Sequence, residues 1–461
     1  MRHTCEVPRR PVMSPADSAW LGMRHRGGPM VVDAVLRIDG DLDADVVRDL
    51  FRERLLPRFP ALSRRPAAVS GLLGKVTGLA GWDPGWVPDL HEVIGEVRLD
   101  GPLTRQVLET AASALVSVSL DPWVTPWRVD VVRGGDLRSS ALVIRLHHSI
   151  GDGVALNTVL DALLDPVPDP LPGRDEKDST SPRTGDRRPT NRGAHRGLRA
   201  AAAAVAVPPM FLAVVAAATR RRLPLRDTGV TTGVAWSRPH DLAGLKATAA
   251  ARGVSLNDVL LAALAGGLRT YLLAQGQPAD DARVIVPVDL RAPDGPVDGD
   301  LGNHIGVLFV RLPVSTADVA ARVAAVHKHT RRLKRSLQPG STALLLRAVG
   351  VVPRRLQEAA AALLGASADA VVSNVPGPTV ERAIAGRRLH MLVFWVPRVG
   401  AMTLGVSVFS YAGTVTVGVA TASACGAGGR REVALTAAVD AELDSMARLR
   451  GRDVAGRAAL S

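Results

Sequence analysis

The stretch His147-His148-Ser149-Ile150-Gly151-Asp152-Gly153 stands between a strand-like and a helix-like segment. Residues 140–146 form a short apolar run that indicates a strand, and residues 154–164 show apolar side chains at helical spacing. By chance, the pattern His-His-x-x-x-Asp-Gly is expected in on the order of one in a thousand chains of this length. A histidine at the end of a buried strand, beside a glycine-rich turn, can stand at the mouth of a cleft.

The geometry of a strand gives the two histidines different roles. Adjacent residues on a strand point to opposite faces, so His147 and His148 do not easily converge on one ion or one substrate. This counts against a metal site, which also needs carboxylates at matching distances. Neutral imidazole is well suited to accept a proton from a hydroxyl that attacks a carbonyl. We therefore expect one of the two imidazoles to act as a general base.

The rest of the heptad predicts how the turn is held. Asp152 is expected to begin the helix, where exposed amides favour a carboxylate, and to pair with an arginine. Gly151 and Gly153 permit the turn and a close approach of the backbone. The plainer alternative is that both histidines are ordinary strand-end residues and that Asp152-Gly153 is only a turn.

The length of the chain, 461 residues, predicts two domains, because one hydrophobic core stops growing near roughly 250–300 residues. Residues 166–196 are rich in Pro, Asp, Arg, Ser and Thr without apolar periodicity, which is typical of a solvated linker. We expect domains at residues 13–165 and 226–461, joined by a linker and an apolar helical crossover at 166–225. The expected elements are strands at 31–38, 283–289, 305–312, 403–410 and 414–420, and helices at 43–56, 258–273 and 317–337.

The net charge of +13 favours an anionic partner. Candidates are the phosphates of a nucleotide-bearing cofactor, an anionic bilayer surface and nucleic acid. Nucleic acid is the weakest of these, because the chain has no zinc-ligand spacing, no aromatic RNA-binding signature and no basic helix with a heptad extension. We expect no nucleic-acid partner.

The two cysteines, Cys5 and Cys425, form neither a disulfide framework nor a metal set, which fits a reducing compartment. The basic N-terminus lacks the apolar core of a secretory signal, so we expect a cytoplasmic protein. Residues 200–219 carry no charge and are flanked by arginines, but they are mostly alanine and contain Pro208-Pro209. A membrane span, interfacial attachment and a buried interdomain connection all stay open for this segment.

Several segments in this order resemble the bacterial wax ester synthase/diacylglycerol acyltransferase family, a branch of the CoA-dependent acyltransferases. The resemblance covers nearly the whole chain from Met13. Besides the heptad, it rests on SPADSAW at 14–20, SLNDVL at 255–260, PVDLR at 287–291, Gly302-Asn303 before a strand, and NVPGP at 374–378.

The resemblance implies an α/β fold of two chloramphenicol-acetyltransferase-like domains, with mixed sheets flanked by helices and an active-site tunnel at their interface. It implies an acyl-CoA-dependent O-acyltransferase that acts on diacylglycerol or a long-chain alcohol and makes triacylglycerol or wax ester. Acyl-CoA is then a co-substrate, with no bound cofactor and no metal. Peripheral contact with the inner face of the cell membrane or with lipid inclusions is also expected. The alternatives are acylation of a specialised metabolite or glycolipid hydroxyl, and a non-catalytic lipid-surface protein of the same fold.

By the same resemblance, His148 is the catalytic base and Asp152 is structural rather than a relay partner. We expect His147 to matter less for activity than His148, unless it holds the turn. Gly153 belongs to the substrate-positioning set. Arg291 is a candidate partner of Asp152, although an arginine after a strand is also ordinary.

Three further residues are candidate positioning groups. Asn257 and Asp258 match a family motif needed for activity, and Asn257 is a candidate oxyanion donor at a helix start. A plain helix cap explains the pair equally well. In the family, the segment that begins at Asn374 lies near the substrate channel, although such a stretch is most often a rigid turn.

Two segments depart from the family pattern. Thr125-Pro126-Trp127-Arg128 stands where Pro-Leu-Trp-Glu is usual, a segment associated with acyl or alcohol binding. An acidic residue that commonly follows the last hairpin is absent from Ala420-Thr421-Ala422-Ser423. Neither change removes the base, but both leave the acceptor open.

Overall fold

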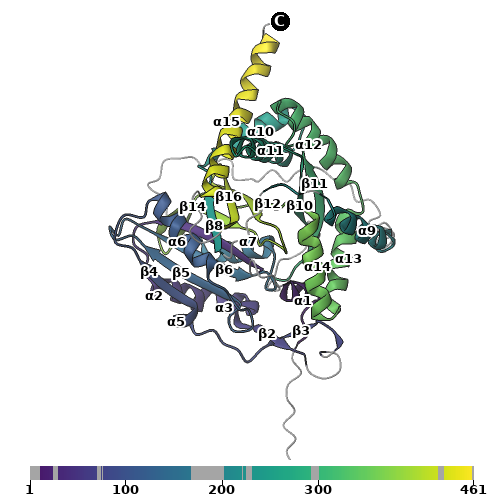
Figure 1. Cartoon of the computed structure of the whole chain (residues 1–461). Coiled ribbons are helices and arrows are strands. Elements are labelled where there is room, and N and C mark those ends of the chain that lie inside the picture. The colour runs from purple at the N-terminus through teal and green to yellow at the C-terminus, as the bar shows by residue number, and fades with distance from the viewer. Residues whose placement is uncertain are drawn as a thin grey trace, which may run out of the picture.

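Two mixed β-sheets flanked by helices make up the protein, as a computed structural model shows (Figure 1). The structure describes residues 11–23, 30–69, 74, 76–167, 202–220, 222–224, 231–291, 301–423 and 430–458. Cys5, Cys425 and most of the linker predicted at 166–225 lie outside the described residues.

The first sheet has seven strands and is antiparallel except for the pair β4 and β5. Its order is β4 (Ile94–Arg98), β5 (Trp127–Arg133), β6 (Ser139–His147), β1 (Val31–Asp39), β14 (Arg387–Trp395), β13 (Arg382–Ile384) and β7 (Asp165–Pro166).

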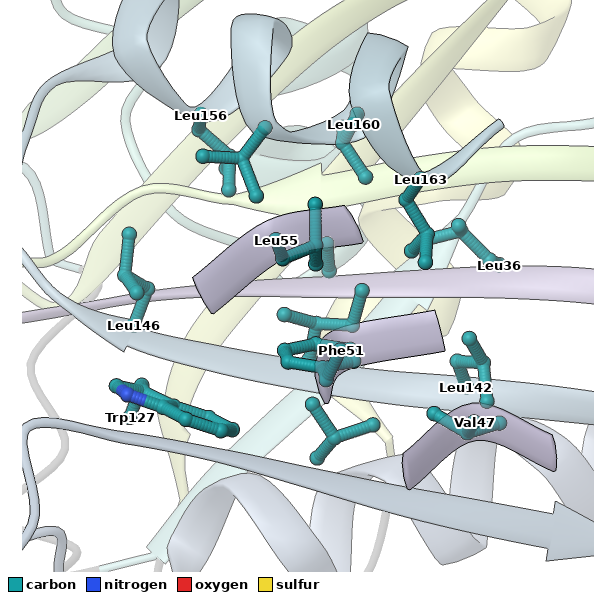
Figure 2. Packing of buried hydrophobic residues seen from close by; sticks show 14 of the residues in the cluster. Leu36, Val47, Phe51, Leu55, Trp127, Leu142, Leu146, Leu156, Leu160 and Leu163 are labelled. Atoms are coloured by element: carbon teal, nitrogen blue, oxygen red, sulfur yellow. The ribbon is translucent and has the colours of Figure 1, made fainter. Parts of the chain in front are cut away.

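The centre of the first sheet is buried on both faces. Every residue of β6 is buried, which explains why its sequence is a continuous apolar run rather than an alternation. One face of β6 carries Leu142 and Leu146, which pack with Leu156 and Leu160 of the following helix (Figure 2). The other face carries Val143 and packs toward the second sheet. The strand that leads to His148 is therefore held from both sides.

The second sheet combines parallel and antiparallel pairs. Its order is β11 (Ile305–Leu312), β10 (Ala282–Asp289), β12 (Ala370–Pro376), β15 (Leu404–Tyr411), β16 (Thr414–Ser423) and β8 (Thr231–Trp236), with β9 (His240–Asp241) also pairing with β16. A separate hairpin joins β2 (Arg65–Ala68) and β3 (Ala80–Asp83).

Along its described strands the chain passes between the sheets three times, from β7 to β8, from β12 to β13 and from β14 to β15. Strands β13 and β14 come from the second half of the sequence but belong to the first sheet, where β14 pairs with β1 from Asp33↔Trp395 onward. The chain then returns to the second sheet at β15. The two sheets therefore do not coincide with the sequence ranges 13–165 and 226–461, which stay a prediction as domain limits.

Helices cover the outer faces of both sheets. In Figure 1, α10, α11 and α12 gather at one end, and α9, α13 and α14 lie along the edge formed by β11. The helices are α1 (Pro15–Gly22), α2 (Ala44–Leu50), α3 (Leu56–Arg58), α5 (Leu90–Val93), α6 (Arg105–Ser117), α7 (Gly153–Leu163), α9 (Val207–Ala218), α10 (Leu242–Ala251), α11 (Leu256–Ala274), α12 (Val319–Lys334), α13 (Gln338–Val351), α14 (Arg354–Ser367) and α15 (Arg431–Ala458), with a π-helix at Phe51–Leu55 and a 3-10 turn at Pro60–Ser63.

The helix at 43–56 differs from the sequence prediction, and the apolar segment at 200–219 is divided near its two prolines. The helix expected at 43–56 contains the π-helical segment Phe51–Leu55, which places Phe51 and Leu55 in the core (Figure 2). A turn at Ala206 separates the helical residues 202–205 from α9, and Pro208 and Pro209 lie in the first turn of α9, where the missing N–H groups need no partner. By length and composition, α11 is the one helix of the described chain that could cross a membrane, and most of it is buried.

Candidate active site

The heptad forms the turn between β6 and α7, beside the start of β1. The backbone N–H of His147 donates to the carbonyl of Pro126 at 2.8 Å, and that of His148 donates to the carbonyl of Met30 at 2.7 Å. Ile150 N–H donates back to the His147 carbonyl at 3.0 Å and closes the turn. The predicted placement at a strand-to-helix turn is confirmed.

His147 is buried and takes part in the turn itself. Its Nδ1 lies 2.8 Å from the hydroxyl of Ser149 and accepts the backbone N–H of Ser149 at 3.2 Å. Since Nδ1 accepts, a neutral His147 carries its proton on Nε2. These contacts support the view that His147 stabilises the turn.

His148 is buried, at 8 % exposure, against the ring of Trp20 from α1. The two rings are stacked, with centroids 4.4 Å apart. Nδ1 of His148 is buried and has no hydrogen-bond partner in the described part of the chain. Burial lowers the pKa of His148, against the opposing effects of the Asp152 carboxylate, the histidine's own carbonyl and Asn303. The imidazole is therefore neutral near pH 7, the form that accepts a proton.

Asp152 is the N-cap of α7, and its carboxylate accepts hydrogen bonds from several groups. Its carboxylate accepts the backbone N–H groups of Val154 and Ala155, both at 3.1 Å, and that of His304 at 3.0 Å. Arg291 adds an ion pair at 3.0 Å, so the predicted pairing between Asp152 and an arginine occurs. A carboxylate with four such contacts ties the turn to the second half of the chain.

The glycines of the turn are required by close packing rather than by backbone angle, since neither has a positive φ. A Cβ on Gly151 would lie 2.7 Å from Cβ of Ala155 and 3.2 Å from Cβ of Leu301. A Cβ on Gly153 would lie 3.1 Å from a methyl group of Val375. A side chain at Gly151 would therefore clash with α7, and one at Gly153 would require Val375 of the second sheet to shift by a few tenths of an ångström.

Asn303 and Asp17 support His148, and the sequence alone did not identify either as a site residue. The Asn303 side-chain amide donates to the backbone carbonyl of His148 at 2.7 Å and to the Asp17 carboxylate at 2.8 Å. Asp17 also accepts the backbone N–H of Asn303 at 3.0 Å. All three residues are buried, so they hold the backbone of the histidine from α1 and from the residues before β11. The only sequence signal was their place in the family-like segments SPADSAW and Gly302-Asn303.

A cavity of about 70 Å³ lies beside His148, between the two sheets. Its wall is mainly apolar and includes Trp20, Phe394 and Met402, while Ser373 of β12 adds a hydroxyl. Small-molecule pockets are usually about 300–1,000 Å³, so this cavity must widen to admit a substrate. The predicted tunnel stays a prediction.

Three predicted positioning residues lie elsewhere. Asn374 and Asn257 contact each other through their side-chain amides and line a different cavity, of about 40 Å³, with residues of α11 and α15. Asp258 forms a capping box with Ser255 and accepts a hydrogen bond from Thr330 at 2.6 Å. The cap is Ser255 rather than Asn257, and the structure does not bring these residues to the cavity beside His148.

The two departures from the family pattern lie outside the cavity beside His148. Trp127 is a core residue: its ring stacks on Phe51 at 5.2 Å, and its Nε1 donates to the Leu62 carbonyl at 2.9 Å (Figure 2). Arg128 pairs with Asp130 at 2.9 Å on the far side of β5. Thr421 of the second segment donates to the buried carboxylate of Glu432, which α15 supplies.

Metal-ligating side chains do not gather in the described ranges: no three of His, Cys, Asp and Glu there form a group that could hold an ion.

Solved structures with the same architecture include acyltransferases and a condensation domain. The wax ester synthase/diacylglycerol acyltransferase from Marinobacter aquaeolei VT8 matches with a TM-score of 0.63 and 21% identity, over 95% of this chain and 99% of that one. Trichothecene 15-O-acetyltransferase from Fusarium sporotrichioides matches with a TM-score of 0.64 and 10% identity, over 96% and 97% of the two chains. These likenesses show the fold, that of the CoA-dependent acyltransferases.

The chain belongs to the wax ester synthase/diacylglycerol acyltransferase family. The family model of the wax ester synthase/diacylglycerol acyltransferase catalytic domain matches residues 13–260, and that of the WS/DGAT C-terminal domain matches residues 301–427. A Mycobacterium tuberculosis protein named as a diacylglycerol O-acyltransferase is 28% identical over 398 residues, which cover 82% of this chain and 87% of that protein. The predicted family and the predicted enzyme class, an acyltransferase, are confirmed.

Proposed function

We propose that this protein transfers a long-chain acyl group from acyl-CoA to diacylglycerol or to a long-chain alcohol, with His148 as general base. The observation that carries the proposal is a buried histidine with a lowered pKa beside a mainly apolar cavity. The family and the names of the relatives supply the donor and acceptor classes.

The reaction needs one base and one oxyanion site. The His148 imidazole takes the proton of the acceptor hydroxyl while the oxygen attacks the thioester carbonyl. The tetrahedral intermediate then collapses, the carbon–sulfur bond breaks, and the imidazolium returns its proton to the leaving thiolate. Because no covalent intermediate on the enzyme is needed, no second nucleophile has to stand beside His148.

Two donors in the cavity wall can stabilise the oxyanion. Ser373 contributes a hydroxyl, and Trp20 contributes an indole N–H that is buried without a partner in the described chain. An unpaired buried donor is costly, so a partner on the bound substrate would recover that cost. An oxyanion donor is typically worth about 3–4 kcal/mol.

The first test measures CoA release from palmitoyl-CoA with diacylglycerol, hexadecanol or a small polar alcohol, for the native protein and for His148→Ala. We expect acceptor-dependent release that falls about 10²- to 10⁴-fold in the variant. His147→Ala, a matched change one residue away, should keep more activity than His148→Ala at equal folded content.

Each possible result with the three acceptors supports a different function. Turnover of the polar alcohol alone would replace the lipid acceptors by a specialised-metabolite or glycolipid hydroxyl. Release from no acceptor by a folded native protein would contradict acyl transfer and favour the non-catalytic lipid-surface protein.

We further propose a cytoplasmic protein in peripheral contact with a lipid surface. Helix α9 supports this contact, because Phe211, Leu212 and Val215 are exposed along it and an exposed arginine, Arg220, follows its end. Apolar side chains next to cations are typical of helices that lie in a bilayer interface.

A further inference from the structure

A second cavity, of about 430 Å³, opens where strands β10 and β12 begin and β11 ends. The last residues of α9 and α14 complete its wall. Its charged lining consists of Arg220, Arg222, Arg283, Arg311, Asp280, Asp281 and Asp369.

Two of these arginines are already engaged. The Arg311 guanidinium pairs with Asp281 at 2.9 Å, and that carboxylate also accepts the hydroxyl and backbone N–H of Ser315. Arg222 donates to backbone carbonyls at the end of α14, including that of Ala368 at 2.7 Å. Arg222 therefore neutralises the negative end of a helix and is not available to a ligand.

Two other arginines stay available. The Asp369 carboxylate accepts the backbone N–H groups of Leu223 and Arg283, both at 2.9 Å, rather than a guanidinium. Across the described chain, neither the Arg220 nor the Arg283 guanidinium has an ion-pair partner within 4.0 Å. Asp280 is the remaining free carboxylate of the wall and is exposed.

Two arginines of the cavity lie on neighbouring strands at directly opposed positions. Arg283 and Arg311 stand directly opposite each other in the β10–β11 register. Like charges directly opposite each other are destabilising, and the carboxylate of Asp281 compensates only the charge of Arg311. Burial first, and then Arg220, lower the pKa of Arg283, while Asp369 opposes them. Burial and the nearby arginines, Arg311 first, also lower the pKa of His329.

This arginine cavity lies on the same sheet face as the cavity beside His148. Along β10, Arg283 lines the first cavity, and Ile285 and Pro287 line the second. Side chains two residues apart share a face, and four residues of strand span about 13 Å. The other two strands repeat this order, from Arg311 to Val307 on β11 and from Asp369 to Val371 and Ser373 on β12.

We propose that the arginine cavity binds the phosphate groups of the CoA part of acyl-CoA, with the thioester arm running along this sheet face to His148. The inference rests on the proposed function, which makes acyl-CoA the donor. An extended pantetheine arm is comparable in length with about four extended residues, which matches the separation of the two cavities. Arg220 and Arg283 bind the phosphates, and the His148 imidazole meets the thioester at the other end.

The proposal implies a movement when the donor binds. Ile285, Val371 and Leu364 of α14 pack together between the two cavities. The arm can pass only if α14 shifts away from the sheet, which would also widen the small cavity beside His148.

The test compares a donor with phosphates and a donor without them. Arg220→Gln/Arg283→Gln is assayed with palmitoyl-CoA and with the palmitoyl thioester of N-acetylcysteamine, which lacks the nucleotide and its phosphates. Losing two charge-assisted hydrogen bonds should raise KM for palmitoyl-CoA about 10- to 100-fold, with kcat unchanged. The truncated donor should react equally well with variant and native protein. Arg138→Gln, an exposed arginine at the opposite end of β6 from His148, is the matched control.

Direct binding separates failure of this site from failure of the proposed function. Adenosine 3′,5′-bisphosphate should bind the native protein in calorimetry and bind the double variant at least about tenfold more weakly, even if no acyl transfer is seen with any donor. Equal binding to both proteins, or an equal loss of activity with both donors, would overturn the phosphate site. Loss of binding to phosphatidylglycerol vesicles, with unchanged binding of the bisphosphate, would assign the arginines to a lipid headgroup and overturn it too.

Discussion

Ser373 and Asn374 are neighbours on β12 and lie on opposite faces of the second sheet. Ser373 lines the cavity with His148, whereas Asn374 contacts Asn257 in the cavity beneath α11. Asn374 begins the family-like stretch at 374–378, and Ser373 immediately precedes it. The comparison shows that only alternate residues of such a stretch can reach the reacting atoms, because side chains of a strand point to opposite faces in turn.

Single substitutions on the two faces give the largest contrast. Ser373→Ala removes a candidate oxyanion donor and should lower kcat by about 10²- to 10³-fold. Asn374→Ala should leave kcat within about twofold. It should lower the free energy of unfolding by at most about 1 kcal/mol, because it removes one exposed hydrogen bond. Steady-state kinetics and thermal unfolding of both variants measure the difference.

The reverse result would break the comparison. A large loss of kcat in Asn374→Ala, with normal activity in Ser373→Ala, would mean that the face with Asn257 meets the substrate. Trp20 would then be the remaining donor in the wall beside His148.

A second, smaller effect concerns the support of His148. Asn303→Leu removes the amide that donates to the carbonyl of His148 and to Asp17. A small displacement of a reacting group can cost about 10²-fold, so kcat should fall by up to that amount while KM for the donor stays the same. Because Asn303 raises the pKa of His148, its loss should also move the acid limb of the pH profile to lower pH.

This prediction distinguishes positioning from simple stability. Asp17→Asn keeps a side chain of the same size but weakens the hold on Asn303, so it should show a smaller loss of kcat in the same direction. If Asn303→Leu folds and retains native kcat and an unmoved pH profile, Asn303 has no positioning role.

The turn that carries His148, with the strand before it and the helix after it, could be predicted because its decisive signals are local. The apolar run before His147, the helical spacing after Gly153 and the capping preference of Asp152 all concern neighbouring residues. The pair of Asp152 with Arg291 was also foreseeable, since a buried carboxylate needs a cation and the resemblance suggested which one.

The parts that sequence could not supply depend on distant pairing. Nothing in β14 indicates that it joins β1 rather than a neighbouring strand of its own half, because strand partners are chosen by tertiary packing. The position of Asn257, in contact with Asn374, depends on how α11 packs on the second sheet. Asn303 reaches His148 across 155 residues of chain, so no local pattern reveals the contact.

The smallest predicted effect is a shift in the pH dependence of kcat/KM. His148 must be neutral to accept a proton, and burial lowers its pKa below the ordinary value of 6.5. The acid limb should therefore lie at lower pH than that of an ordinary imidazole, with activity falling about tenfold per pH unit once the imidazole is mostly protonated. Asp33 on β1 is a second group that titrates on the acid side of neutrality, because burial raises its pKa to about 6. Asp33→Asn should leave the acid limb of the pH profile in place. If the acid limb moves in Asp33→Asn but not in Asn303→Leu, the titrating group is Asp33 rather than His148.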